Sequence, residues 1–335
     1  MKRILLSLVV VSIFAAISTP AYASLTSFQT FVGSVGYSSD GCGTTSTSCT
    51  LSAQVPVGAT VLAAYLYTSA VQNGIGGRGG TLNGSAVSYS ALLGANNANL
   101  QAARADVTSI VTAAVGGGSA VPINFLVTET NSSSIDGEAL IVVYNLPSLA
   151  TSTVGILDGF SATTGDTSSI NFATPLNPAA PGFVAEMIIG DGFSCCGPSS
   201  LQVSRITVNG TLITQNAGNN DDNKDAFDSD GNLITVGSNF EDPFSPLLPT
   251  YLQDHERYNL IPQIAAGSTT ISVATLNPSN DDNIFLELFY VSGSGSVNTP
   301  PPPVPEPSSM LLLGAGLIGL AGLGYRKFRV QVQKN

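Results

Sequence analysis

The chain has 335 residues and a formal net charge of −11, with 22 acidic residues against 11 basic ones. Because proteins that bind nucleic acid need clustered cations to neutralise phosphates, this balance argues against DNA or RNA as a partner. Glycine is abundant at 35 residues and tryptophan is absent. Together with runs rich in Ser, Thr and Val that lack a helical period, this composition predicts an all-β protein.

The beginning of the chain has the organisation of a secretory signal peptide. Two basic residues precede an apolar stretch, and the small residues Ala21 and Ala23 lie just before Ser24. This order is typical of a leader that signal peptidase removes. We therefore predict a signal peptide over residues 1–23 and a mature chain that begins at Ser24.

The body contains two copies of one sequence pattern. Four pairs of segments match in order, namely 30–33 with 153–155, 61–70 with 183–192, 81–85 with 207–211, and 105–144 with 256–290. Each copy ends in a strongly apolar strand, which closes at Tyr144 in the first copy and at Tyr290 in the second. We predict two tandem antiparallel β-sandwich domains, jelly-roll-like, over 24–149 and 150–297. The alternative is a single large sandwich or jelly roll with weak internal symmetry.

Both copies contain an Asn-Gly pair between short apolar runs. The first is Asn83-Gly84 and the second is Asn209-Gly210. Asn and Gly tolerate the positive φ angles that a type I′ turn requires, and this turn matches the twist of the flanking strands. We predict a two-residue β-hairpin at each pair.

Four cysteines in an exported chain suggest disulfide bonds. Cys42 and Cys49 flank a short loop, and closing it would contribute about 2.5 kcal/mol in the chain-entropy account. Cys195 and Cys196 are adjacent, so their Cα atoms lie about 3.8 Å apart, which is shorter than the usual disulfide span. We predict a Cys42–Cys49 bond, with Cys195 and Cys196 either as a strained vicinal pair or as free thiols. A zinc site is a poor interpretation, because the sequence has no Cys-x-x-Cys pair and one histidine.

The second copy carries an acidic insertion over 216–250. Its aspartates crowd one short loop, and they are Asp221, Asp222, Asp225, Asp228 and Asp230. Carboxylate oxygens are the ligands that Ca²⁺ prefers, but an EF-hand register would place Ala226 and Gly237 at ligand positions. Two interpretations stand, a Ca²⁺ site and a solvated acidic surface loop. No other cofactor is predicted.

His255 is the only histidine, so any catalytic triad would have to use it. Its neighbours Asp254, Glu256 and Arg257 suggest an exposed cluster of self-paired charges. Enzymes that act on carbohydrate usually hold sugar rings with Trp, which this chain lacks. We predict that the protein is not an enzyme. Because the spatial separation of its many carboxylates cannot be seen in the sequence, a glycoside-hydrolysing pair stays as the alternative.

The end of the chain has three parts. A Pro-rich linker over 298–307 precedes an apolar segment over 308–325, and a basic tail follows over 326–335. The apolar run of about 15 residues would span about 22 Å as a helix, against about 30 Å for the hydrocarbon core of a bilayer. We predict a short transmembrane helix over 308–325, whose basic end stays in the cytoplasm.

This tripartite order resembles the sorting signal of PEP-CTERM proteins, a class of exported bacterial proteins. The residues that carry the resemblance lie before and after the apolar segment, and they are Val304, Pro305, Glu306, Pro307, Arg326, Lys327 and Arg329. The resemblance implies that a membrane-embedded exosortase recognises the tail and cuts near the Pro-Glu-Pro motif. It also implies delivery to the cell surface or extracellular matrix, with a transient anchor in the inner membrane.

Without these two end segments, the body has 5 basic and 21 acidic residues and a net charge of −16. Divalent cations and neutral sugars, exopolysaccharide among them, are then the remaining candidate ligands. PEP-CTERM proteins are typical of bacteria that make exopolysaccharide. We therefore expect a structural or adhesive role in an exopolysaccharide or biofilm layer. The alternative is a secreted polysaccharide-acting enzyme with a carboxylate site.

Overall fold

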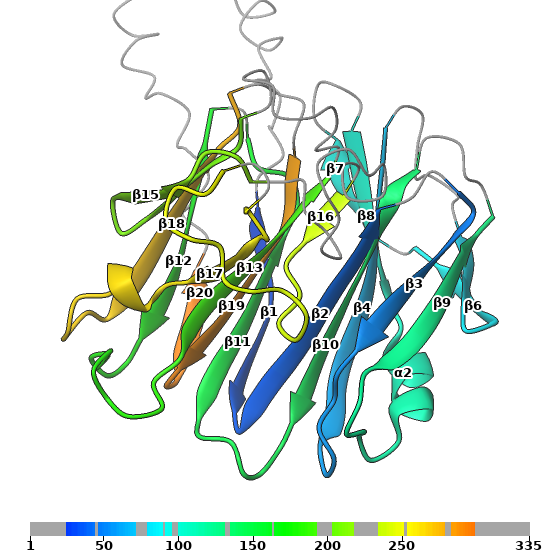
Figure 1. The fold of residues 1–335 in the computed structure, drawn as a ribbon, viewed down its shortest axis with the longest axis horizontal. Coiled ribbons are helices and arrows are strands. Elements are labelled where there is room, and N and C mark those ends of the chain that lie inside the picture. The colour runs from blue at the N-terminus through cyan, green and yellow to red at the C-terminus, as the bar shows by residue number, and fades with distance from the viewer. Residues whose placement is uncertain are drawn as a thin grey trace, which may run out of the picture. The chain divides into compact units, whose positions relative to one another are not determined.

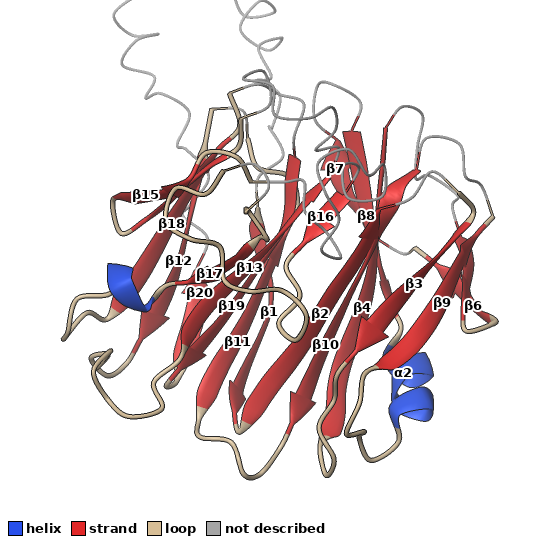
Figure 2. Cartoon of the chain, viewed as in Figure 1, coloured by secondary structure: helices blue, strands red, loops and turns tan. Residues whose placement is uncertain are grey.

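The computed structural model describes most of the body of the chain. The described ranges are 25–43, 46–71, 79–89, 91–95, 100–130, 135–162, 164–192, 203–217, 234–250, 253–278 and 283–298. Most of these residues form antiparallel strands, so the all-β prediction is confirmed (Figure 2). The predicted signal peptide, Pro-rich linker, transmembrane helix and basic tail lie outside the described residues, apart from the start of the linker at residue 298. Within the described ranges, no helix is long and apolar enough to cross a membrane.

Two antiparallel sheets form the first half of the body. Inner sheet 1 has the order β2 (Val35–Gly43), β10 (Ile135–Asn145), β4 (Thr60–Val71), β8 (Leu100–Asp106) and β7 (Ala91–Ala95). Outer sheet 1 has the order β3 (Ser48–Ala53), β9 (Ile123–Glu129), β5 (Gly79–Leu82) and β6 (Ser85–Ser88). Helix α2 (Thr108–Val115) connects β8 to β9 and buries Val111 and Val115.

Two further antiparallel sheets form the second half. Inner sheet 2 has the order β1 (Thr26–Gly33), β11 (Ser152–Asp158), β19 (Asn283–Ser292), β13 (Ala185–Gly192) and β16 (Ile234–Val236), and β17 (Arg257–Asn259) also pairs with β13. Outer sheet 2 has the order β15 (Thr211–Thr214), β14 (Arg205–Val208), β18 (Thr270–Leu276), β12 (Asp166–Phe172) and β20 (Gly295–Asn298). A 3₁₀ turn, η2 (Ile261–Gln263), precedes β18.

The strand order of the first half recurs in the second. In the inner sheets, the equivalent strands are β2 and β11, β10 and β19, β4 and β13, and β8 and β17. In the outer sheets, they are β3 and β12, β9 and β18, β5 and β14, and β6 and β15. The predicted match between 61–70 and 183–192 therefore joins two equivalent strands, β4 and β13. The predicted match between 30–33 and 153–155 is wrong, because 30–33 lies in β1, which pairs with β11 itself. Strand β2 occupies the place in the first half that β11 has in the second.

Three large apolar cores fill the spaces between the four sheets, which lie side by side in Figure 1. Strand β10 explains why a middle core exists. Its Ala139, Ile141 and Val143 pack against the second half, whereas Leu140 and Val142 pack against outer sheet 1. Since successive side chains point to opposite faces, a strand buried on both faces reads as one continuous apolar run. The described strands through β20 form one compact unit.

Both Asn-Gly hairpins have the predicted turn. The φ angles are 49° and 76° at Asn83 and Gly84, and 47° and 83° at Asn209 and Gly210. Each pair separates two four-residue strands, β5 from β6 and β14 from β15. The local sequence therefore determines both hairpins.

The described part of the acidic insertion lies along strand β2, which forms one edge of inner sheet 1. The amide of Asn239 accepts a hydrogen bond from the Ser39 N–H at 3.2 Å and donates one to the Tyr37 carbonyl at 2.8 Å. The Ser39 hydroxyl also donates to the Gly237 carbonyl at 2.7 Å. These bonds occupy backbone groups of edge strand β2 that another strand could otherwise pair with. They also hold the two halves together.

Candidate functional site

A disulfide bond joins the two sheets of the first half. Cys42 lies on β2 of inner sheet 1 and Cys49 on β3 of outer sheet 1, and their Cα atoms are 6.2 Å apart. The predicted Cys42–Cys49 pairing is therefore confirmed. Cys195 and Cys196 lie outside the described residues.

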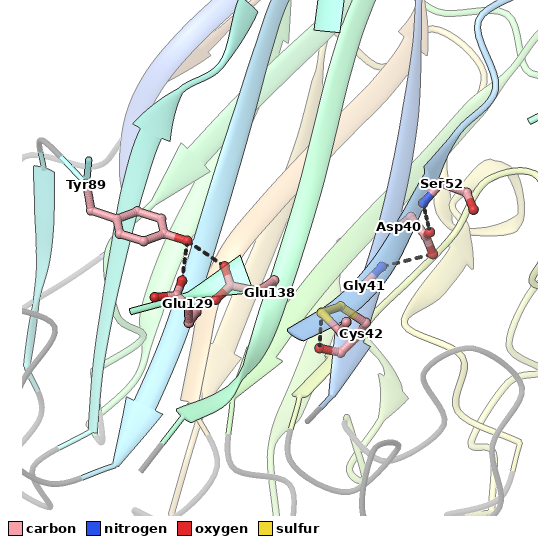
Figure 3. The surroundings of a disulfide bond; sticks show 8 residues. Asp40, Gly41, Cys42, Ser52, Tyr89, Glu129 and Glu138 are labelled. Carbon is pink, nitrogen blue, oxygen red and sulfur yellow. Dashed lines mark hydrogen bonds between the residues drawn. A yellow bond between two sulfur atoms is a disulfide. The ribbon is translucent and has the colours of Figure 1, made fainter. Parts of the chain in front are cut away.

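A pair of buried glutamates lies next to this disulfide (Figure 3). Glu138 on β10 is paired with Cys42 on one side and with Thr68 of β4 on the other. Glu129, at the end of β9, approaches from the outer sheet. The two residues are 1% and 6% exposed, so both carboxyl groups are removed from water.

The hydroxyl group of Tyr89 connects the two glutamates. Tyr89 follows β6, and its hydroxyl oxygen lies 2.8 Å from Glu129 Oε1 and 2.7 Å from Glu138 Oε2. Each glutamate also has a second buried oxygen without a hydrogen-bond partner among the described residues. The site thus contains two carboxyl groups and one phenol, enclosed between two sheets.

Burial determines the electrostatics of this site. It raises the pKa of Glu138 well above the ordinary glutamate value, and the charge of Glu129 raises it further. Burial, followed by the charges of Glu138 and Glu129, also raises the pKa of Tyr89 well above 10. The Tyr89 hydroxyl is therefore protonated over the whole physiological range, and Glu138 holds its proton at a higher pH than an exposed glutamate does.

The predicted exposed charge cluster around His255 is wrong. Asp254 and Glu256 are fully buried, and Arg257 pairs with Glu186 at 3.1 Å on the neighbouring strand β13. Hydroxyl groups take the place of cations around Asp254, because its carboxylate accepts hydrogen bonds from Tyr258 at 2.6 Å and from two other hydroxyls. Asp254 and Glu256 lie in the loop before β17, and the burial of their side chains removes them from the exposed pairs that the sequence suggested.

The titration of this second cluster is also governed by burial. Burial raises the pKa of Asp254 to about 6, against the opposing hydrogen bonds from Thr214, Tyr258 and Ser245. Burial lowers the pKa of His255, so the imidazole is neutral at pH 7. A buried acid beside a partly buried neutral histidine differs from the solvated ion pairs that the sequence suggested.

Arg104 is a structural residue that the sequence analysis did not single out. Its guanidinium forms an ion pair with Asp158 of β11, and it lies over the ring of Phe28 at 3.3 Å. Tyr67 donates a hydrogen bond to the same carboxylate at 3.1 Å. The signal that could have indicated this role is a lone arginine within the small, apolar stretch of β8, in a body with few cations.

The remaining predicted site residues are not placed by the structure. The five aspartates of the proposed Ca²⁺ loop, 221–230, lie outside the described residues, as do the signal cleavage site and the sorting residues. Among the residues that are described, no group of three or more His, Cys, Asp or Glu side chains could hold a metal ion. The Ca²⁺ hypothesis therefore stays a prediction.

Comparison with protein families adds the decisive observation on the tail. Residues 303–327 match the PEP-CTERM protein-sorting motif. The chain carries a PEP-CTERM sorting signal. This match confirms the resemblance seen at Val304–Pro307 and at Arg326 and Lys327, and it identifies an exported, exosortase-targeted protein with a destination in the cell envelope or outside the cell. No curated protein and no solved structure matches the chain.

Proposed function

We propose that this PEP-CTERM protein is a non-catalytic structural or adhesive component of an extracellular polysaccharide or biofilm layer. The observation that carries the proposal is the sorting signal at 303–327, attached to a body of four closely packed sheets. Sheets with continuous apolar cores give a stiff body that resists deformation. We further infer that the body consists of two tandem sandwich domains, predicted over 24–149 and 150–297, which associate through their inner sheets and exchange strand β1, since β1 lies in the first range but pairs with β11 of the second half.

The glutamate pair supports a structural role for the first half. Glycosidases keep their two carboxyl groups about 5–9.5 Å apart, so that a sugar or a water can enter between them. At this site one hydroxyl group approaches both Glu129 and Glu138 within hydrogen-bond distance. The Tyr89 hydroxyl occupies the position between the interacting oxygens and both glutamate side chains are buried, so a sugar would first have to displace the tyrosine. The pair therefore suits contact between sheets better than attack on a glycosidic bond.

The proposed partner is an exopolysaccharide of the producing cell. The test is retention of the mature protein on that polysaccharide, with and without Ca²⁺, combined with an assay for new reducing ends. Retention without new reducing ends supports adhesion. New reducing ends would support the alternative, a polysaccharide-acting enzyme, and absence of retention under both conditions would contradict the adhesive role.

Ca²⁺ at the 221–230 loop is the proposed regulator of this binding. Five aspartates within ten residues repel one another unless a cation screens them, and oxygen ligands suit Ca²⁺. EGTA is then expected to lower the melting temperature of the mature protein. The control is a variant with Asp225→Asn and Asp228→Asn, in which EGTA should have no effect. An unchanged melting temperature in the unmodified protein would leave the loop as a solvated surface.

Processing of the tail is tested by the intact mass of the protein from the native cell surface and culture fluid. A chain from Ser24 to the region of 305–307 is expected. Replacing Glu306 with Ala should leave the tail attached, whereas Pro300→Ala, outside the matched motif, should be processed normally. A membrane-bound chain that retains residues 308–335 without either substitution would contradict exosortase processing.

A further inference from the structure

Two different connections join outer sheet 1 to inner sheet 1. One is the covalent Cys42–Cys49 bond, and the other is the contact of Tyr89 and Glu129 with Glu138. The first joins edge strands β2 and β3. The second joins the end of β9 and the residue after β6 to β10, at the other side of the outer sheet in strand order. Loss of the second contact would therefore leave the β5–β6 hairpin paired with β9 but held against inner sheet 1 by the apolar core alone.

The number of hydrogen atoms at this site limits its protonation state. A phenol has a single hydrogen to donate, whereas an ionised carboxylate has none. The Tyr89 oxygen lies within 2.8 Å of one carboxyl oxygen and 2.7 Å of the other, and its one hydrogen can serve only one of them. The second short contact is attractive only if that carboxyl group itself carries a proton and donates it to the phenol oxygen. The observed geometry thus requires that one of the two glutamates is protonated, in addition to the tyrosine.

We propose that Tyr89, Glu129 and Glu138 form a proton-dependent latch that holds the β5–β6 hairpin and β9 of outer sheet 1 against inner sheet 1. When the shared proton is lost, two buried carboxylates face each other and one hydroxyl can satisfy only one of them. Their repulsion and the cost of keeping them from water favour entry of water between the sheets. The sheet edge that carries Tyr89 then opens.

The surroundings of the latch offer no compensating cation among the described residues. On β2, Cys42 is in the disulfide, and Asp40 on the same strand is held by the backbone N–H groups of Gly41 and Ser52. On β4, Thr68 carries no charge, and a hydrogen bond from its side chain only partly opposes the increase that burial causes in the pKa of Glu138. Two described arginines, Arg104 and Arg257, form ion pairs with Asp158 and Glu186, and neither of these carboxylates belongs to the latch. Burial raises the pKa of Glu138, which is consistent with release of the proton above the range of an ordinary glutamate.

Hydrogen–deuterium exchange of the mature, disulfide-bonded protein between pH 6 and pH 9 tests the latch. The second half supplies an internal control, because its hairpin over 205–214 has the same place in the fold and experiences the same chemical effect of pH on exchange. We expect the protection of residues 79–89 to fall at least tenfold more than that of 205–214 as the pH rises. Equal changes in the two hairpins would overturn the proposal.

Substitutions in the latch test whether loss of its proton, and no other effect of pH, causes the loss of protection. Glu138→Gln supplies a permanent N–H donor, so the excess loss of protection at pH 9 should disappear, and Glu129→Gln should act in the same way if the first variant does not fold. Tyr89→Phe should reduce protection at both pH values. Glu241→Gln, at an exposed site, is the matched control and should resemble the unmodified protein. The same excess loss of protection in Glu138→Gln and Glu129→Gln would refute the latch. If adding CaCl₂ to the unmodified protein at pH 9 restores protection of residues 79–89, the two glutamates form a cation site and not a latch.

Discussion

Glu287 shows how a single buried carboxyl group can make this protein sensitive to pH. It lies on β19, the strand of the second half that corresponds to β10, and it is fully buried. Ser168 donates a hydrogen bond to one of its oxygens at 2.8 Å, and the other oxygen has no partner among the described residues. Burial raises the pKa of Glu287 to about 8. Each half therefore has a buried acid, Glu138 on β10 or Glu287 on the equivalent strand β19, that contacts its outer sheet.

Replacing Glu287 with Gln should make the protein more stable in alkaline solution. The pKa of Glu287 is higher in the folded chain than in the unfolded chain, so its contribution is fully present below about pH 4.5 and is lost as the pH rises through about 8. Gln mimics the protonated acid and does not titrate. We expect similar free energies of unfolding at pH 4 and a gain on the order of a few kcal/mol for the variant at pH 9.

Urea denaturation at a series of pH values measures this difference. Glu241→Gln is the control: burial also raises the pKa of Glu241, but this side chain is exposed, so the variant should change the profile in the same direction and to a smaller extent than Glu287→Gln. Parallel profiles for the Glu287→Gln variant and the unmodified protein would mean that Glu287 ionises in the folded chain as it does in water.

At the scale of single elements, the hairpins and the disulfide follow from local sequence, and the pairing of distant strands does not. Asn83-Gly84 and Asn209-Gly210 determine their own turns through positive φ angles. The contact between Tyr89 and Glu138 joins residues 49 positions apart. It depends on the register of four strands, which no local pattern specifies. Such contacts, and with them the glutamate site, could not be predicted from the sequence.

Gly210→Ala should destabilise the protein by about 1–2 kcal/mol, because residue 210 has a φ angle of 83°, where a side chain with a Cβ atom is unfavourable. A Cβ atom there would contact nothing within 4 Å, so the cost is conformational and not steric. Gly117→Ala is the matched control, since that site is equally open and has no positive φ angle. Thermal unfolding of both variants provides the comparison, and equal losses would contradict the explanation.

The Cys42–Cys49 bond should contribute about 2.5 kcal/mol, as expected for closing a loop of about eight residues. The double variant with Cys42→Ser and Cys49→Ser removes it without leaving a single thiol. Guanidinium denaturation of this variant, compared with the unmodified protein at pH 6, measures the contribution. A loss below about 1 kcal/mol would indicate that β2 and β3 are already held close in the unfolded chain.

For the whole molecule, the most informative finding is the core between the two halves. The continuous apolar runs of β10 and β19 indicated strong burial, but the sequence interpretation assigned them to two separate sandwiches. The structure shows that both strands contribute residues to one core between the halves, and that Arg104 of the first half forms an ion pair with Asp158 of the second. Composition predicts apolar strands, but it cannot show that the second face of β10 is covered by the second half of the chain.

Replacing Arg104 with Met should cost about 3–5 kcal/mol, because it leaves the buried Asp158 without its cation. Adding Asp158→Asn to that variant should recover part of the loss. Arg205→Met on β14 is the matched control, since that arginine is exposed. Chemical denaturation of the four chains gives the comparison, and a loss for Arg104→Met no greater than for Arg205→Met would show that the pair does not hold the halves together.

The pairing of β1 with β11 has a consequence for export. The Thr26 hydroxyl donates to the carbonyl of Asp158, which is 132 positions further along the chain. The predicted signal peptide over residues 1–23 would deliver the N-terminal end first, so β1 would leave the translocation channel long before its partner strand. Contacts of such long sequence separation form slowly. The earliest segment to arrive outside is thus among the last to be completed, and its exposed edge must be kept from other chains until β11 follows.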